Sequence, residues 1–248
     1  MDTTQQEVRK KTHYGITFGS QLDLSDAQLT ALVKLISKPI KAVQKQGLGG
    51  RAVVLHCELE GIGRVVIKQY RRGGIFRALL RNKYLRWGAT RSEQEWEQLN
   101  RARSLGVNVP TPIAFAHTKG PFYKAWLVTK EINETKSIEQ LVRSDEVLAR
   151  SLLADVLAQI EKLILSDLFH IDLHPGNVMV DSSGKIYLLD FDKAYTFKGK
   201  KNTLRDMYLH RWRRAVLKHE LPEFLTEVIS LGLRKNFEKE SLGIQNVS

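Results

Sequence analysis

The pattern of apolar and polar positions divides the chain into a strand-rich first part and a helix-rich second part. Within residues 43–70, the β-rich runs "RAVVLHCEL" and "RVVIKQY" are separated by "EGIG", which predicts a β-hairpin. The runs "VPTPIAFAHT" and "PFYKAWLVTK" flank "KGP" and predict a second hairpin. The first part is therefore expected to form an antiparallel sheet.

Helical periodicity marks three other stretches. Thr90 and Glu93 have the spacing of a capping box, and Gly106 is well placed to end that helix. Across residues 147–164, apolar residues recur at i, i+4 over about five turns, which predicts one long amphipathic helix. Residues 204–233 also follow a helical pattern and are rich in Arg, Lys and His.

The order of these elements predicts an α+β fold of two lobes. An N-terminal lobe, residues 1–130, would hold the antiparallel sheet and one main helix, after an N-terminal extension of about residues 1–37. A helix-rich C-terminal lobe, residues 131–248, would follow, with the junction near residues 129–133. A chain of 248 residues that is 42% apolar can bury a sizeable core.

Composition limits the environment and the partners. The single cysteine, Cys57, excludes a disulfide framework and a cysteine-rich zinc site, and it is interpreted as a small apolar residue of a strand in a reducing compartment. The N-terminal sequence lacks the apolar core of an export signal, and no segment reaches about 18 apolar residues. A formal charge of +12 indicates an anionic partner such as nucleic acid, a membrane surface or an acidic sugar.

Candidate chemistry concentrates in "HIDLHPGNVMVDSSGKIYLLDFDKA", residues 170–194. The Pro-Gly pair prevents a helix, so Asp172 and Asn177 lie on an irregular loop where their side chains can converge. The next run predicts strand, turn and strand, which would return Asp190 close to Asn177. Carboxylate and carboxamide oxygens suit Mg²⁺ with its waters and nucleotide phosphate oxygens, and Asp172 is left to accept a proton. The alternative is a pair of solvated, Asp-rich turns.

This arrangement resembles the catalytic and metal-binding loops of the protein-kinase-like fold, H-x-D-L-x-x-x-N and D-F-G. The resemblance implies ATP and Mg²⁺ as cofactors, with Asp172 as the proton acceptor and Asn177 and Asp190 as metal ligands. It also implies that Lys68 of "VVIK" holds the α- and β-phosphates and that Glu95 is its ion-pair partner.

Glu93 or Glu97 could replace Glu95 in the ion pair with Lys68. Other parts of the resemblance concern the nucleotide. Adenine is expected at backbone groups of Lys130 and Ile132, near the junction of the lobes. The run "QGLGG" matches the phosphate-covering loop, in which backbone N–H groups approach anions where side chains are absent, at Gly47, Gly49 and Gly50.

Departures from the kinase pattern indicate which class of acceptor the protein uses. Ile171 stands where many regulated protein kinases carry an Arg, His174 where Ser/Thr protein kinases carry a Lys, and Asp192 where D-F-G has its glycine. The 58 residues after Asp190 in this 248-residue chain contain no A-P-E motif. The departures favour a small or lipid-linked acceptor over a protein. His170 is expected to brace the loop rather than to take part in the chemistry.

The wider sequence is similar to the lipopolysaccharide core kinases, and most similar to the 3-deoxy-manno-octulosonic acid (Kdo) kinases of Gram-negative bacteria. The resemblance covers most of residues 45–220 and includes the basic segment after Lys68, "LLDFDKA" and "TLRDMYLHRWRRAVLKH". It implies ATP-dependent phosphorylation of a sugar hydroxyl of Kdo in the lipopolysaccharide inner core (Kdo-lipid A). It also implies a peripheral location on the cytoplasmic face of the inner membrane.

The basic segment, residues 71–87, fits that acceptor chemically. Guanidinium groups bind carboxylate and phosphate bidentately, and Kdo-lipid A presents both. Interleaved Leu, Phe and Trp residues could rest on an anionic membrane surface, where each basic residue adds roughly 1 kcal/mol. The simpler interpretation is an ordinary solvated helix with one core-facing stripe. No protein partner is evident. The segment's basic residues are Arg71, Arg72, Arg77, Arg81, Lys83 and Arg86.

Several alternatives stay open. A core heptose kinase or an aminoglycoside- or choline-type kinase would use the same loops. A catalytically inactive kinase-fold regulatory protein is expected to have lost catalytic positions, whereas Lys68, Asp172 and the two metal-ligand positions are all present. A nucleic-acid-binding protein would account for the charge, but no docking motif or aromatic stacking platform accompanies it, so no nucleic-acid partner is expected.

Overall fold

The computed structural model describes residues 7–37, 53–70, 84–85 and 88–241. The chain divides into two compact units, which are described separately. Unit 1 comprises residues 1–100 and 110–131, and unit 2 comprises residues 101–109 and 132–248. The predicted phosphate-loop glycines, Gly47, Gly49 and Gly50, and most of the basic segment lie outside the described residues.

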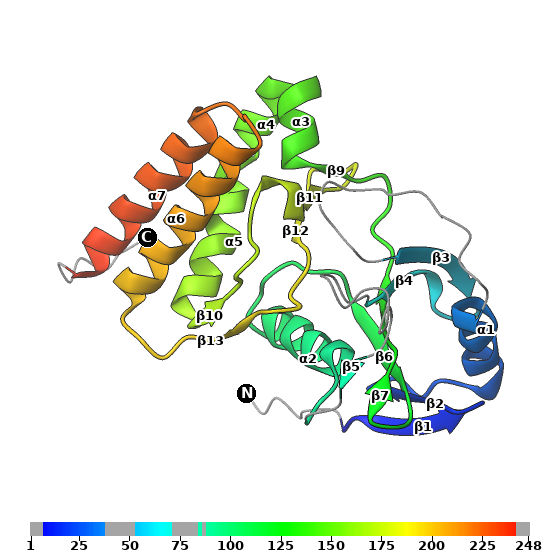
Figure 1. The fold of residues 1–248 in the computed structure, drawn as a ribbon. Helices are drawn as coiled ribbons and strands as arrows, with labels where there is room; N and C mark the ends of the chain where they lie inside the picture. The colour runs from blue at the N-terminus through cyan, green and yellow to red at the C-terminus, as the bar shows by residue number, and fades with distance from the viewer. Residues whose placement is uncertain (1–6, 38–52, 71–83, 86–87, 242–248) are drawn as a thin grey trace. The chain divides into compact units, whose positions relative to one another are not determined.

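Unit 1 contains a six-stranded antiparallel sheet (Figure 1). Its strands, in spatial order, are β1 (Arg9–His13), β2 (Ile16–Ser20), β6 (Pro112–Thr118), β8 (Ala125–Lys130), β4 (Gly63–Gln69) and β3 (Val53–Leu59). Both predicted hairpins are confirmed, because β3 pairs with β4 and β6 pairs with β8. A short strand, β7 (Phe122–Tyr123), lies between β6 and β8 in sequence and pairs with β5 (Tyr84–Leu85).

The sequence analysis described residues 1–37 only as an extension, whereas part of this segment completes the sheet of unit 1. Strand β2 pairs with β6, and helix α1 (Asp26–Ser37) buries Leu29, Leu32 and Ile36. The apolar pattern gave little sign of β1, because four of its five side chains are exposed. Its place is set by backbone hydrogen bonding to β2, which apolar periodicity does not report.

Helix α2 (Arg91–Ser104) begins and ends where the sequence predicts. The Thr90 hydroxyl accepts a hydrogen bond from the Glu93 backbone N–H at 3.3 Å, and Gly106 follows the helix with a φ of +73°. Asn108, just beyond, donates its N–H to the Gln159 side chain and accepts from the Leu188 N–H, so residues 101–109 belong to unit 2.

Unit 2 is mainly helical (Figure 1). Its long helices α5 (Leu153–Leu165), α6 (Lys201–Lys218) and α7 (Phe224–Ser241) pack together, after α3 (Ile138–Ser144) and α4 (Glu146–Ser151). A three-stranded sheet has the order β12 (Ile186–Leu188), β11 (Val178–Val180), β9 (Lys136–Ser137), and β10 (Leu168–Phe169) pairs with β13 (Tyr195–Thr196). Among the described helices, none is long and apolar enough to cross a bilayer.

The prediction of one continuous helix over residues 147–164 is wrong in one respect. The chain forms α4 and α5, which are separated at Leu152. Leu152 keeps right-handed helical dihedrals, with φ of −87° and ψ of −8°, and both Leu152 and Leu153 are buried. The apolar rhythm therefore continues through the interruption, so periodicity alone could not locate it.

Gly19 in β2 offers a test of how closely unit 1 is packed. A Cβ at Gly19 would overlap the ring of Phe115 on β6, and that ring is 1% exposed. Gly19→Ala should therefore lower the free energy of unfolding by about 1–3 kcal/mol, as overpacking does. Phe115→Leu should relieve part of this loss in the double variant. Urea unfolding of the two single variants and the double variant measures the coupling, and strictly additive losses would contradict the predicted overlap.

Candidate active site

One group of the predicted site residues is a buried ion pair in unit 1. Strand β4 buries Val65, Ile67 and Gln69 and presents Lys68 on the opposite face. Lys68 Nζ lies 3.0 Å from Glu95 Oε1 and 2.9 Å from Oε2. Glu95 is only 2% exposed, and a buried carboxylate is retained where a cation neutralises it.

The pairing identifies which acid of α2 contacts Lys68. Glu93 instead binds Lys10, at 2.7 Å, and Glu97 is exposed. The three acids follow one another at intervals of two, which on a helix places them on different faces. Only Glu95 shares the buried face of α2 with Trp96 and Leu99.

Tyr70 also contacts the Lys68–Glu95 pair, and the sequence analysis missed it. Its hydroxyl donates to Glu95 Oε2, and Lys68 Nζ lies 5.3 Å from the centroid of its ring. Tyr70 is 3% exposed, so the hydroxyl contributes to the solvation of a carboxylate removed from water. The signal was available, because Tyr70 follows Lys68 by two residues and alternate residues of an extended strand share a face.

Another group of the predicted site residues belongs to unit 2, where Asp172 and Asn177 lie on the loop between β10 and β11. Residues 175–177 form a single 3₁₀ turn, which starts at Pro175 as a helical first turn permits. The Asn177 side-chain NH₂ donates to the Asp172 carbonyl at 2.9 Å. This bond fixes the carboxamide, so that its oxygen is directed away from the Asp172 backbone.

Asp190 is brought to Asn177 through backbone hydrogen bonds. Val178 pairs with Leu188, and the Leu189 N–H donates to the Asn177 carbonyl at 2.9 Å. Asp190 itself has a φ of +66°, an uncommon conformation for a residue with a side chain. Such conformations persist where the surroundings hold them, and they concentrate at functional sites.

The residues at this place fit magnesium. Asn177 supplies a neutral oxygen and Asp190 a charged one, and Mg²⁺ uses one or two such protein ligands together with waters and phosphate oxygens. In the described part of the chain, no group of three His, Cys, Asp or Glu side chains is arranged to hold a metal ion. The donor set is therefore one carboxylate and one carboxamide, without the imidazole or thiolate ligands that zinc prefers.

His170 joins the loop to the strand that leads to Asp190. It is fully buried, and its Nε2 lies 2.8 Å from the Leu189 carbonyl, so Nε2 carries the proton. Its backbone N–H donates to the Tyr208 hydroxyl at 2.7 Å, and that hydroxyl donates to the Leu168 carbonyl at 2.7 Å. Burial lowers the pKa of His170 and raises the pKa of Tyr208, so both side chains are neutral.

Asp172 contacts two cations that the sequence analysis did not single out. Arg211 Nη2, from α6, donates to Asp172 Oδ1 at 2.6 Å. Lys193 Nζ lies 3.9 Å from Asp172 Oδ2. The Asp172 carboxylate, predicted as the proton acceptor, is thus flanked by positive charge.

His174, beside Asp172 in the loop, is turned toward buried side chains. Its Nδ1 accepts from the Gly176 N–H at 3.1 Å, and its ring centroid lies 5.8 Å from that of His219. His219 Nδ1 in turn lies 3.2 Å from the buried carboxylate of Glu139. A Cβ at Gly176 would approach the Glu139 carboxylate to 2.7 Å, so glycine allows α3 this close to the loop.

The predicted adenine contacts involve backbone groups at the end of β8. The Lys130 N–H donates to the Thr111 carbonyl at 2.8 Å, and the Glu131 N–H donates to the Arg64 carbonyl at 2.9 Å. These two amides are therefore hydrogen-bonded within unit 1, and the adenine contact at Lys130 stays a prediction. Ile132 begins unit 2.

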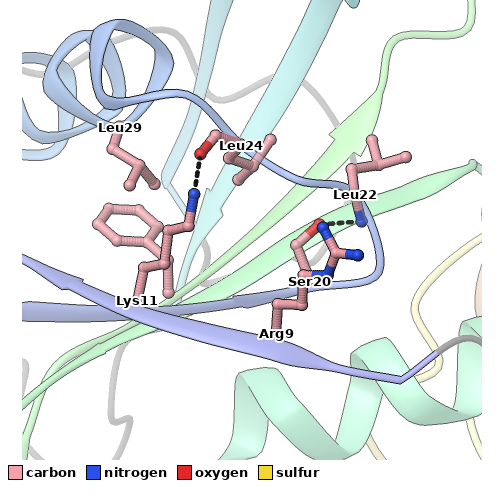
Figure 2. Close-up of a pocket in the computed structure, with 7 residues that line it drawn as sticks. Arg9, Lys11, Ser20, Leu22, Leu24 and Leu29 are labelled. Atoms are coloured by element: carbon pink, nitrogen blue, oxygen red, sulfur yellow. Dashed lines mark hydrogen bonds between the residues drawn. The ribbon is translucent and has the colours of Figure 1, made fainter.

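A small pocket in unit 1 contains none of the predicted site residues. Figure 2 shows it between the β1–β2 hairpin and the segment that leads into α1. Lys11 crosses its edge and donates to the Leu24 carbonyl at 2.8 Å. The lining is otherwise mainly apolar and includes Phe18, Leu24 and Leu29, which belong to the core of unit 1. The pocket is therefore a feature of core packing.

The lowered pKa of His170 predicts how stability depends on pH. Unfolding exposes the imidazole, which then takes up a proton below its ordinary pKa of about 6.5, whereas the buried ring resists protonation. The contribution of the neutral His170 to the free energy of unfolding should be fully present above about pH 6.5. It should be lost as the pH falls below this value, by up to about 1.4 kcal/mol per pH unit. His170→Gln should reduce this slope, whereas His210→Gln, at an exposed position of α6, should not. Urea unfolding at pH 7.5 and 5.0 measures the slope of the free energy of unfolding against pH. An unchanged slope for His170→Gln would refute the assignment of this slope to His170.

Comparison with known proteins agrees with the resemblance. Residues 40–226 match the model of the lipopolysaccharide kinase (Kdo/WaaP) family. A 3-deoxy-D-manno-octulosonic acid kinase from Vibrio cholerae serotype O1 is 31% identical over 175 residues, which are 69% of this chain and 70% of that protein. The protein of the same name from Vibrio vulnificus strain CMCP6 is 34% identical over 153 residues, 60% of this chain and 64% of that protein. One from Xylella fastidiosa strain 9a5c is 30% identical over 173 residues, 68% of each chain.

The family match covers most of the chain. It includes β3 and β4 with Lys68, helix α2 with Glu95, and the whole loop from His170 to Asp190. Only the N-terminal hairpin, α1 and most of α7 lie outside it. The α+β architecture, with an antiparallel sheet followed by helices, is that of the kinase-like fold. The chain therefore belongs to the lipopolysaccharide kinase (Kdo/WaaP) family and is a kinase.

Proposed function

We propose that the protein transfers the γ-phosphoryl group of ATP to a sugar hydroxyl of Kdo in the lipopolysaccharide inner core, with Kdo-lipid A as the acceptor. The names of the relatives from Vibrio and Xylella, 3-deoxy-D-manno-octulosonic acid kinases, support this acceptor. ATP is the phosphoryl donor that a kinase family implies, and Mg²⁺ fits the donor set of Asn177 and Asp190.

In this mechanism Asp172 accepts the proton of the acceptor hydroxyl. The hydroxyl oxygen forms a bond to the γ-phosphorus, and the bond from that phosphorus to the bridging oxygen of ADP breaks. A positioned base of this type contributes roughly 10² to 10⁴-fold to the rate. The Asn177 side chain holds the Asp172 backbone through its 2.9 Å hydrogen bond, which orients the base.

Two groups of residues would neutralise the charge on the phosphates. Lys68 orients the α- and β-phosphates, and its ammonium group is itself fixed by Glu95 and Tyr70. Asn177 and Asp190 would hold Mg²⁺, which would supply further positive charge to the phosphate oxygens. The remaining nucleotide contacts are proposed at Gly47, Gly49, Gly50, the Lys130 carbonyl and Ile132.

The observation that carries the proposal is the hydrogen-bonded loop of unit 2, in which Asp172, Asn177 and Asp190 converge. A regulatory protein without catalysis would have no need to keep Asp190 at a φ of +66° or to hold the Asn177 carboxamide. The preformed Lys68–Glu95 pair favours catalysis for the same reason. A core heptose kinase would use the same residues, so the acceptor is the part that requires an experiment.

We further propose that the protein works at the cytoplasmic face of the inner membrane as a peripheral protein. The acceptor is an anionic lipid, and the chain carries a formal charge of +12. Basic residues within about a Debye length of an anionic surface each add roughly 1 kcal/mol of attraction. Binding to anionic but not to zwitterionic vesicles, weakened by salt, would support this location.

The decisive test is phosphorylation with radiolabelled ATP and Mg²⁺, using Kdo-lipid A, heptosylated core and a generic protein as separate acceptors. We expect label in Kdo-lipid A. Asp172→Asn should lower the rate roughly 10² to 10⁴-fold, whereas Asp155→Asn, at an exposed position of α5, should leave it unchanged. Label in heptosylated core alone would identify a heptose kinase, and label in the protein alone would overturn the acceptor class.

Tyr70 provides a test of the Lys68–Glu95 pair. Tyr70→Phe removes one hydrogen bond to a buried carboxylate and should lower the free energy of unfolding by about 1–3 kcal/mol. It should also lower kcat/KM for ATP, because Glu95 then holds Lys68 less firmly. Tyr14→Phe, at a side chain that is 76% exposed, is the matched control. Unchanged stability and unchanged kcat/KM for Tyr70→Phe would show that the hydroxyl has no part in the pair.

A further inference from the structure

Arg211 lies next to the proposed base, and its contact with Asp172 is not an ordinary surface ion pair. The Nη2–Oδ1 distance of 2.6 Å is that of a short, charge-assisted hydrogen bond. Both side chains are about one-third exposed, 33% for Arg211 and 34% for Asp172.

Helix α6 holds Arg211 rigidly in this position. Trp212, the next residue, is 2% exposed and donates its indole N–H to the Leu225 carbonyl at 2.9 Å. Tyr208, nearly one turn earlier, is also buried and its hydroxyl is bonded to His170 and Leu168. Anchors on both sides of Arg211 fix the backbone from which the guanidinium extends, as a binding residue requires.

The guanidinium has donors that Asp172 does not use. Asp172 accepts from Nη2, whereas Nε is buried and has no hydrogen-bond partner among the described residues. A guanidinium carries five N–H groups in a planar fork that matches two oxygens of one carboxylate. A buried N–H without a partner is rare in a folded protein, so the unpaired Nε calls for an explanation, and a bound ligand that shifts the guanidinium is one.

The neighbouring residues show why the cation comes from α6. In the loop itself, His174 stands two residues after Asp172, but its Nδ1 accepts from the Gly176 N–H. Burial, together with nearby His219 and Arg211, holds the pKa of His174 below its ordinary value. His174 is therefore neutral and directed inward, and Arg211 and Lys193 supply the positive charge around Asp172.

We propose that Arg211 binds the carboxylate of the acceptor sugar and thereby places a hydroxyl of that sugar at Asp172. This inference rests on the proposed function, and it names the group of the acceptor that the enzyme recognises. A 3-deoxy-octulosonic acid carries a carboxylate at neutral pH. The guanidinium already binds a carboxylate, that of Asp172, so a second one matches the chemistry of the site.

The acceptor carboxylate is a better partner for Arg211 than the transferred phosphoryl group. The phosphates have their own cations in the mechanism, namely Lys68 and the Mg²⁺ held by Asn177 and Asp190. Arg211 instead contacts the residue that receives the acceptor's proton, so a group bound to it belongs to the acceptor. Heptose has no carboxylate, so this contact would also select Kdo over heptose.

The test compares two acceptors, Kdo-lipid A and its carboxylate methyl ester, with the parent enzyme and Arg211→Gln. The parent should use the ester with a kcat/KM roughly 10- to 100-fold lower, as expected when a hydrogen bond to a charged group is lost. Arg211→Gln should show a similar loss with Kdo-lipid A but no further loss with the ester. Arg211→Lys, which keeps the charge without the fork, should recover part of the discrimination.

Arg214→Gln is the matched control, because Arg214 is an exposed arginine of the same helix. It should discriminate between the two acceptors as the parent does. Arg211→Gln should also keep the parent's KM for ATP and its thermal midpoint, which separates acceptor binding from a structural role. If Arg211→Gln fails to fold, Arg211→Lys carries the same comparison.

The outcomes distinguish this inference from the function on which it rests. A parent enzyme that phosphorylates neither acceptor overturns the proposed function. A parent enzyme that phosphorylates both with equal kcat/KM overturns only the carboxylate contact. Arg211→Gln that loses activity yet still discriminates between the acceptors would assign the carboxylate to another residue and Arg211 to the phosphoryl group or to the fold.

Discussion

The backbone of Leu189 is the point on which the proposed chemistry of unit 2 depends. Its N–H donates to the Asn177 carbonyl at 2.9 Å, and its carbonyl accepts from His170 Nε2 at 2.8 Å. The residue before Asp190 is therefore bonded, through its N–H and its carbonyl, to both the end and the start of the loop. This double attachment over-determines the backbone, which explains how Asp190 can keep a φ of +66° at a cost of order 1–3 kcal/mol.

The charged side chains of the two units differ in how far they are buried. In unit 1, Glu95 is almost fully buried and is balanced by Lys68 and Tyr70, so the pair is preformed before any nucleotide arrives. In unit 2, Asp172 stays one-third exposed and is flanked by Arg211 and Lys193. In the proposed mechanism, the first arrangement fixes a cation for phosphates, and the second keeps a carboxylate accessible to an acceptor. Preorganised charge of this kind contributes to catalysis because it costs no reorganisation during the reaction.

Features set by short-range sequence were predictable, and features set by packing were not. The hairpins, the cap of α2 and the strand-turn-strand after Asn177 follow from turn residues and from residues two to four apart. Tyr70 could have been found by strand alternation. Arg211 could not, because it is 39 residues from Asp172 and looks like any other arginine of a basic helix. The break at Leu152 left no periodic signal, and β1 is held by backbone bonds to β2.

The replacement of a loop lysine by His174 and the presence of Arg211 at Asp172 have one structural cause. His174 is turned inward against His219, which follows α6, and His219 contacts the buried Glu139 of α3. A charged lysine in that place would be desolvated against this cluster, whereas a neutral imidazole is accommodated. The same packing brings α6 close to the loop, where Gly176 leaves space for the Glu139 carboxylate. The short hydrogen bond to Asp172 thus comes from a helix and not from the loop, and a guanidinium on a rigid helix can select a planar carboxylate where a flexible lysine would act as a point charge.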